Sequence, residues 1–273
     1  MNAKAPGPRG HPLWGNSPDY TRDPLGFHVD CARDFGDVVS LRLGLLPVVV
    51  LNHPDHVEEM LVNQARSLGK GLAFDQMRPL IGNGILSSEG SFWLHQRRLI
   101  QPAFHRERLD SYAATMVTDT DRMLASWRDG DVLDVREEMA RLTLQIAGHT
   151  LFGADVSLEA AHVGAALTVI LEHFEARLDS ISYLIPYWVP TPGNIRLKRA
   201  MRILDSLGYG MIRERRQTRT RRDDVLSLLL EVRDEDGNPM PDRQVRDEAM
   251  TLLMAGHETT ALATSRSRGG AGR

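Results

Sequence analysis

A short run of small and polar residues, Ala255-Gly256-His257-Glu258-Thr259-Thr260, lies inside an apolar segment that we expect to be helical over residues 242–264. Glycine and paired threonines are unfavourable in the interior of a helix, so their presence there indicates a use other than helix formation. Small side chains let a flat ligand approach the helix backbone, and a threonine hydroxyl can bond back to a carbonyl one turn earlier. With a carboxylate and a hydroxyl beside this groove, the segment could deliver a proton to a bound molecule.

This segment has two other interpretations, a zinc site and a purely structural role. His257-Glu258 resembles the start of a zinc metalloprotease helix, but that site needs a second histidine one turn later, where Ala261 stands. The zinc interpretation therefore fails. The second alternative is structural, because most Thr-Thr pairs in helices only pack, and the residues alone leave it open.

A second group of residues could bind a carboxylate. Trp93 and Arg97 are four residues apart in a predicted helix over residues 91–101, so they lie on one face of it. The indole N–H and the guanidinium are both hydrogen-bond donors, and arginine binds carboxylates in a bidentate manner. Arg98 and His95 fall on other positions and are interpreted as a solvated charge and a packing or surface residue.

Both segments carry a resemblance to the cytochromes P450. Residues 246–261, "RDEAMTLLMAGHETTA", resemble the central oxygen-binding helix of that family, and residues 93–104, "WLHQRRLIQPAF", resemble its helix with a Trp-x-x-x-Arg pattern. Residues 6–16 and 222–237 resemble the family's proline-rich hinge and the segment before its central helix. The chain thus resembles the amino-terminal part of a soluble, bacterial-type P450.

The resemblance assigns a role to each motif residue. It implies that Ala255 and Gly256 open space over a haem iron, that Glu258 and Thr259 deliver protons during oxygen activation, and that Trp93 and Arg97 contact a haem propionate. Thr260 is counted among the haem-binding residues. Residues 69–90, which we expect to form a long loop, lie where the family first contacts its substrate. Five apolar residues there could line a substrate pocket or simply pack in the core: Phe74, Met77, Leu80, Ile81 and Leu86.

The expected architecture is mainly α-helical with a small amino-terminal β-sheet, an incomplete P450 fold. A proline-rich leader over residues 1–22 would precede strands at 37–43 and 47–52, joined by a turn at Gly44. Residues 1–264 would form part of a single domain, and residues 265–273 ("SRSRGGAGR") a tail outside the family pattern. For that tail we favour a lost reading frame over a flexible end. The expected helices cover residues 23–35, 54–64, 91–101, 106–127, 135–152, 157–178, 194–219, 223–232 and 242–264.

Composition limits the functional classes. The chain has 273 residues, 42% of them apolar, with a formal net charge of −3, which suits a globular protein and argues against nucleic-acid binding. No apolar run is long enough for a signal peptide or membrane anchor, so the expected location is the cytoplasm. The single cysteine, Cys31, excludes an intrachain disulfide and is interpreted as a small buried hydrophobic residue.

The resemblance further implies haem b as cofactor, a small apolar substrate, O₂, and electrons from a ferredoxin or reductase. The family's later Glu-x-x-Arg helix and the loop with its haem-ligating cysteine have no counterpart in this sequence, so no axial metal ligand is assigned. We therefore expect a chain truncated after the oxygen-binding helix. Two hypotheses follow: the family's haem-thiolate monooxygenase activity, or a non-catalytic P450 fragment. A helical binding module unrelated to haem is a third.

Overall fold

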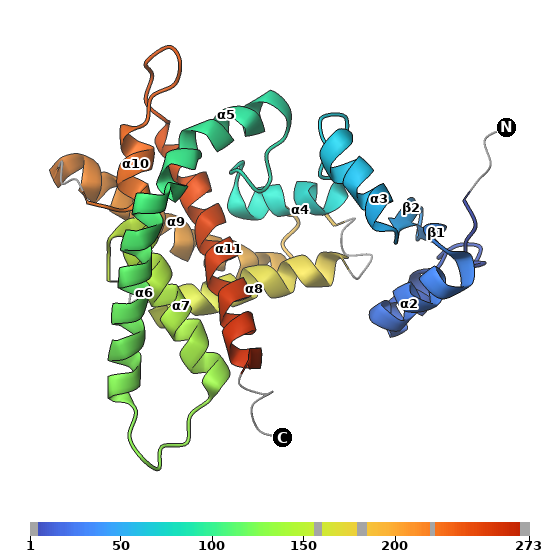
Figure 1. Cartoon of the computed structure of the whole chain (residues 1–273), viewed down its shortest axis with the longest axis horizontal. Coiled ribbons are helices and arrows are strands. Elements are labelled where there is room, and N and C mark those ends of the chain that lie inside the picture. Colours follow the sequence, from blue (N-terminus) through green and yellow to red (C-terminus); the bar gives the residue numbers. More distant parts are fainter. Residues whose placement is uncertain (1–4, 156–159, 179–184, 219–221, 268–273) are drawn as a thin grey trace. The chain divides into compact units, whose positions relative to one another are not determined.

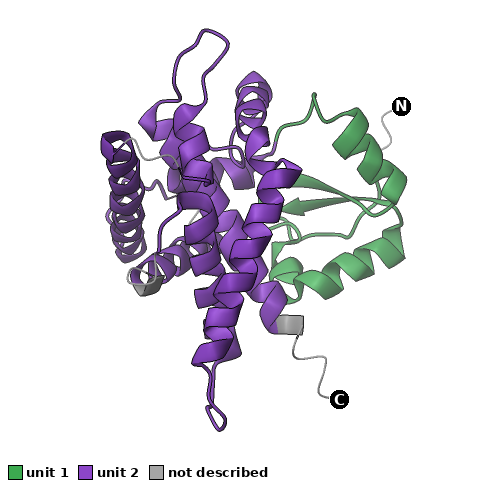
Figure 2. Ribbon diagram, turned by 60° about the vertical axis from the view of Figure 1, so that its left-hand side comes forward, with its two compact units in different colours: residues 1–69 green, residues 70–273 purple. Residues whose placement is uncertain are grey.

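The computed structural model describes residues 5–155, 160–178, 185–218 and 222–267. The chain divides into two compact units, residues 1–69 and residues 70–273 (Figure 2). The single domain over residues 1–264 stays a prediction. Of the predicted tail, residues 265–267 continue the last helix, which ends at Ser267, and residues 268–273 lie outside the described residues.

Unit 1 is a small sheet with short helices. The Asp23 carboxylate accepts a hydrogen bond of 3.0 Å from the Gly26 N–H, and Pro24 occupies the first turn, so the second helix begins where the sequence predicts. The two strands pair antiparallel around Gly44, which has φ +61° as a turn glycine should. The elements are α1 (Ser17–Arg22), α2 (Pro24–Phe35), β1 (Val38–Leu43), β2 (Leu46–Leu51), α3 (Pro54–Glu58) and the π-helical turn η1 (Glu59–Asn63).

One expectation for unit 1 was wrong in detail. Within the predicted leader, residues 17–22 form α1, with Pro18 in its first turn. The helix expected over residues 54–64 is α-helical only to Glu58 and continues as a π-helical turn. Cys31 packs with Val39 and Leu41 in the core of this unit, as expected of a buried hydrophobic residue.

In the described residues of unit 2 every named element is a helix, and loops join these helices (Figure 1). Its α7 runs over the predicted residues, with the Asp134 side chain accepting from two N–H groups at the start and Gly153 in the left-handed conformation at the end. The elements are α4 (Leu72–Ile81), α5 (Gly90–Ile100), the 3₁₀ turn η2 (Gln101–Phe104), α6 (Arg106–Ser126), α7 (Val135–Phe152), α8 (Ala160–Leu178), α9 (Pro192–Thr218), α10 (Val225–Glu231) and α11 (Asp242–Ser267).

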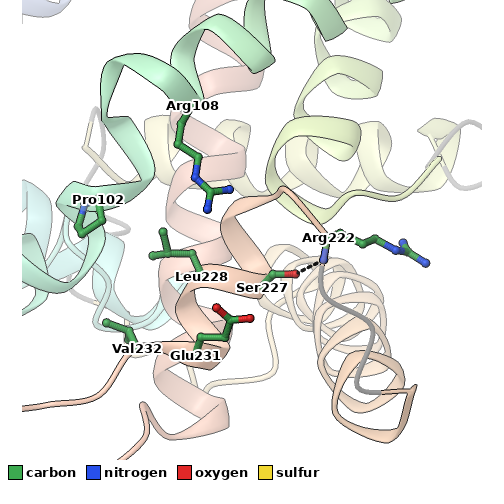
Figure 3. Close-up of a pocket in the computed structure, with 7 residues that line it drawn as sticks. All are labelled: Pro102, Arg108, Arg222, Ser227, Leu228, Glu231 and Val232. Carbon is green, nitrogen blue, oxygen red and sulfur yellow. Dashed lines mark hydrogen bonds between the residues drawn. The ribbon is translucent and has the colours of Figure 1, made fainter.

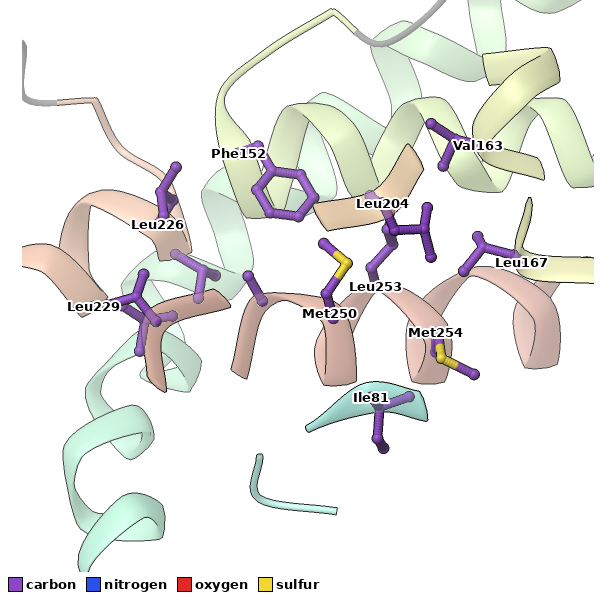
Figure 4. Close-up of a cluster of buried hydrophobic side chains, with 14 of the residues drawn as sticks. Ile81, Phe152, Val163, Leu167, Leu204, Leu226, Leu229, Met250, Leu253 and Met254 are labelled. Carbon is purple, nitrogen blue, oxygen red and sulfur yellow. The ribbon is translucent and has the colours of Figure 1, made fainter. Parts of the chain in front are cut away.

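Helix α11 runs through the core of unit 2 and packs against α7 and α9. Figure 4 shows Met250 and Leu253 of this helix between side chains from several other helices. Each fully buried aliphatic side chain contributes on the order of 1.5–3 kcal/mol, so this cluster is the main stabilising element of the unit. The labelled members are Ile81, Phe152, Val163, Leu167, Leu204, Leu226, Leu229, Met250, Leu253 and Met254.

The prediction of a long loop over residues 69–90 was wrong, because α4 lies within these residues. Gly71 and Gly82 are the caps of this helix rather than loop residues, with φ of +79° and +83°. Pro79 is tolerated within the last turn of α4. Glycine and proline favour a loop by their residue type, but here the two glycines delimit the helix. No helix among the described residues is long and apolar enough to cross a membrane.

The two caps of α4 allow a matched test of close packing. Both glycines have a backbone conformation that costs other residues about 1–3 kcal/mol. A Cβ at Gly71 would meet nothing within 4 Å, whereas one at Gly82 would overlap the Asp247 carboxylate. We expect Gly82→Ala to lower the free energy of unfolding by about 1–3 kcal/mol more than Gly71→Ala, measured by urea unfolding. Equal losses in the two variants would contradict the close approach of Gly82 to α11.

Candidate active site

The exposed face of α11 is formed by the small residues of its motif. Ala255, Gly256, Thr259 and Thr260 are exposed, whereas His257 is buried against α7. The Thr259 Oγ1 donates to the Ala255 carbonyl oxygen over 2.6 Å, so the predicted bond back to the preceding turn is confirmed. A Cβ built on Gly256 would meet nothing within 4 Å. The structure thus leaves an open stretch of helix beside a threonine oxygen that can still accept a hydrogen bond.

Glu258 faces a different side of α11. Its half-buried side chain lines a cavity of about 280 Å³ with residues of α7 and α8, and neither Ala255 nor Thr259 borders that cavity. Burial raises the pKa of the Glu258 carboxyl, and repulsion from Glu175 adds to this, while Arg136 opposes it. A carboxyl group with a raised pKa retains its proton to higher pH and can serve as a proton donor.

His257 has a structural environment. Its Nδ1 lies 3.0 Å from the Thr143 Oγ1 of α7, and burial lowers the pKa of its imidazole. A buried imidazole with a lowered pKa and a hydroxyl partner is typical of a histidine that joins two packed helices. We therefore assign it to the α7–α11 contact.

Trp93 and Arg97 are brought together on α5, as their spacing predicts. The Arg97 guanidinium carbon lies 5.3 Å from the centre of the Trp93 ring. Trp93 is half-buried and Arg97 exposed, and no carboxylate among the described residues forms an ion pair with Arg97. A free guanidinium beside an indole N–H fits a carboxylate of a bound ligand.

Sequence reasoning missed Lys70, which lies between the predicted propionate-binding Trp93 and the predicted substrate-contacting Phe74. Its Nζ lies 5.8 Å from the ring centres of both Trp93 and Phe74, so the indole has two cations near it. The same Nζ donates to the carbonyl oxygens of Ile85 and Leu86 over 2.8 and 2.7 Å. Burial lowers the pKa of Lys70, and Glu89 partly offsets this. No sequence motif identifies this lysine, because most of its partners lie 15 or more positions further along the chain.

The five apolar residues predicted for a substrate pocket occupy different environments. Leu80 and Ile81 are fully buried in the core of unit 2, which is the alternative that the sequence left open. Met77 and Leu86 pack against that core, and Phe74 is half-buried beside Lys70. Substrate contact by Phe74, Met77 or Leu86 stays a prediction.

A further cavity of about 220 Å³ lies where α10 meets the start of α6 (Figure 3). Its polar groups have partners within the chain: Arg108 pairs with Asp223, and the Ser227 Oγ accepts from the Arg222 N–H over 3.2 Å. None of the predicted site residues lines it. We interpret it as a packing gap between ion-paired helices.

Comparison with known proteins decides the family. The family model for cytochrome P450 matches residues 5–266, almost the whole chain. The chain belongs to the cytochrome P450 family. The predicted mainly helical P450 fold with a small amino-terminal sheet is therefore confirmed, although this P450 spans only about half the length of the curated relatives that it matches.

Two bacterial relatives illustrate the similarity. This P450 is 36% identical over 255 residues to cyclooctat-9-en-7-ol 5-monooxygenase of Streptomyces melanosporofaciens, covering 92% of this chain and 54% of the relative. It is 32% identical over 254 residues to pentalenene oxygenase of Streptomyces avermitilis, covering 92% of this chain and 55% of the relative. Among solved structures, retinoic acid bound cyanobacterial CYP120A1 matches with a TM-score of 0.77 and 23% identity, over 95% of this chain and 58% of that chain.

The residues of this P450 fit part of a haem site. The open α11 face at Gly256 suits a flat ring, and the Trp93–Arg97 pair suits a propionate. A cysteine sulfur that could bind haem iron is the part of the site that does not fit. The only cysteine in the sequence, Cys31, is enclosed in the core of unit 1. Burial, followed by Asp30 and Asp34, raises the pKa of its thiol, which opposes the thiolate that iron needs.

Proposed function

We propose that this chain forms the oxygen-activating side of a haem-thiolate monooxygenase that oxidises a small apolar substrate. O₂ is the oxidant, and a ferredoxin or reductase supplies the electrons. The open α11 face beside Thr259 is the observation that carries this proposal. Two relatives are named for cyclooctat-9-en-7-ol and pentalenene, so a compact, mostly hydrocarbon molecule is the substrate class that we infer.

Haem b would bind and activate O₂, and the protein supplies space, orientation and protons. Ala255 and Gly256 leave room above the backbone of α11. Thr259 holds its hydroxyl in place through the Ala255 carbonyl, with its lone pairs free to accept a hydrogen bond. The raised pKa of the Glu258 carboxyl favours its role as a proton donor on the α7–α8 side. Arg97 with Trp93 would bind a propionate. We propose that a single haem contacts both α5 and α11.

A second candidate function concerns the 273-residue chain by itself. Because Cys31 is its only cysteine and is buried, we propose that this chain alone forms no haem-thiolate centre and is non-catalytic. When haem is added to the chain, reduced and treated with CO, we expect no red-shifted Soret band of the thiolate type. Appearance of that band would contradict the non-catalytic assignment and would require Cys31 to leave the core of unit 1.

Haem titration tests the proposed cofactor site independently of activity. We expect Arg97→Ala to weaken haem binding by about tenfold or more, because a charge-assisted hydrogen bond to a propionate is lost. Arg98→Ala is the matched control, since this neighbour is exposed and lies on another side of α5. Within the described part of the chain its ion-pair partner is the exposed Glu235, at 3.9 Å. The affinity is measured from Soret absorbance. Equal affinities for the two variants would remove Arg97 from the haem site.

A further inference from the structure

The segment between α4 and α5 is held against α11 by two buried carboxylates. The Asn83 N–H donates to the Asp247 Oδ2 over 2.9 Å, and the Ile85 N–H donates to the Glu248 Oε2 over 2.8 Å. These bonds join residues more than 160 positions apart in the sequence. They fix the backbone of the segment rather than its side chains, so they constrain its path whatever residues it carries.

The carbonyl groups of the same segment are also bound. The Gln244 Nε2 donates to the Asn83 oxygen over 3.0 Å and to the Glu248 Oε1 over 2.7 Å. Lys70 donates to the carbonyl oxygens of Ile85 and Leu86, as described above. Side chains of α11 and Lys70 therefore bind backbone N–H or carbonyl groups of Asn83, Ile85 and Leu86, an arrangement that leaves the segment little freedom.

Two glycines let the segment approach α11 closely. A Cβ at Gly82 would overlap the Asp247 carboxylate, and a Cβ at Gly84 would overlap the Thr251 hydroxyl. Glycine is the residue that permits such an approach of backbone to helix. The segment and α11 thus share a packed interface and not only hydrogen bonds.

Buried carboxylates are a costly way to hold two elements together. Asp247 is 3% and Glu248 0% exposed, and an apolar pair of similar size would pack there without desolvating a charge. Arg246 compensates Asp247 through a bond of 2.9 Å and pairs in turn with Asp205 of α9. The fold keeps these two acids in spite of this cost, and both bind the backbone of one segment. We infer that the segment has to occupy one defined position on α11.

We propose that Asp247 and Glu248 are positioning residues that lock residues 82–88 onto α11, so that the predicted substrate-contacting segment and the oxygen-activating face form one rigid body. Asp247 lies eight residues before Ala255, about 12 Å along the helix. A change in the lock therefore alters where the substrate lies relative to Thr259. The link to substrate rests on the proposed function, but the lock itself is a property of the chain without haem.

Hydrogen exchange of the 273-residue chain tests the lock. We expect Glu248→Ala and Asp247→Ala to raise the exchange rates of the Ile85 and Asn83 amides, respectively, by about tenfold or more, because each amide loses its buried side-chain acceptor. Exchange in residues 255–260 should stay unchanged. Glu248→Gln keeps an oxygen for the Ile85 N–H and should restore most of the protection.

The matched control is Asp119→Ala, which removes a buried carboxylate of α6 that binds His149 and Arg122 instead of the segment. It should destabilise the fold without raising exchange in residues 82–88. Rates that rise equally in the control, or protection that survives in both alanine variants, would overturn the proposal. Since no haem is present, a failed haem titration and a failed lock are separate results.

Discussion

Replacing Asp224 by alanine should lower the melting temperature of the chain by about 10 °C. Asp224 is 1% exposed and its Oδ2 accepts from the Arg215 Nη1 over 2.8 Å. Its Oδ1 also caps α10 by accepting from the Ser227 N–H over 2.7 Å. The variant leaves an arginine buried without its carboxylate, which costs about 3–5 kcal/mol.

The site of this ion pair explains the size of the effect. Arg215 of α9 also donates to the carbonyl oxygen of Phe152, the last residue of α7, over 2.8 Å. The pair thus joins α7, α9 and α10 at one point. Arg215 would keep its bond to Phe152 in the variant but would lose the charge that stabilises it there.

Thermal unfolding followed by circular dichroism measures this loss. Arg216→Met is the matched control, because this adjacent arginine is exposed and pairs with the exposed Asp242, so its removal should cost about 1 kcal/mol or less. A double variant, Arg215→Met with Asp224→Leu, should recover part of the loss, since no unpaired charge remains. A melting temperature for Asp224→Ala equal to that of Arg216→Met would show that the buried pair contributes nothing.

Local signals in the sequence account for most of the elements. The start of α2 follows from Asp23 and Pro24, and the end of α7 from Gly153, because caps act through neighbouring residues. The loop prediction failed at α4, where Gly71 and Gly82 bound a helix of ten residues that contains a proline. The sequence alone does not show whether a glycine ends a helix or lies in a loop. At α4 the difference comes from the packing of Ile81 in the core, which is a tertiary contact.

The candidate site could be predicted only in part, for a physical reason. The motif residues of α11 are adjacent in the sequence, so their grouping was readable, and the open face at Ala255 and Thr259 agrees with small residues there. The lock by Asp247 and Glu248 was not found, since its partners are backbone amides far away in the chain. One signal was present: three charged residues, 246–248, directly precede an apolar stretch that must be buried.

Glu248→Gln should change the pH dependence of stability more than any other single carboxyl replacement in α11. Burial raises the pKa of this carboxyl to about 7, although its bonds from the Ile85 N–H and Gln244 and the nearby Lys70 oppose the rise, while Asp247 adds to it. In the unfolded chain the pKa returns to its ordinary value of 4.5. Between these two pH values the folded protein therefore binds more protons than the unfolded chain, and its stability must fall as the pH rises.

The expected size of that fall is about 3 kcal/mol between pH 4.5 and pH 7, with no further contribution from Glu248 above pH 7 or below pH 4.5. Glutamine cannot titrate, so the variant should gain about this much relative to the original chain on going from pH 5 to pH 8. Urea unfolding across this range measures the difference in the free energy of unfolding between the variant and the original chain, in which the contributions of the other titrating groups cancel. Glu107→Gln, on the exposed side of α6, is the matched control. A constant difference between Glu248→Gln and the original chain would mean that the bonds from the Ile85 N–H and Gln244, together with Lys70, keep the carboxylate ionised throughout. The lock on residues 82–88 would then hold equally at all pH values in this range.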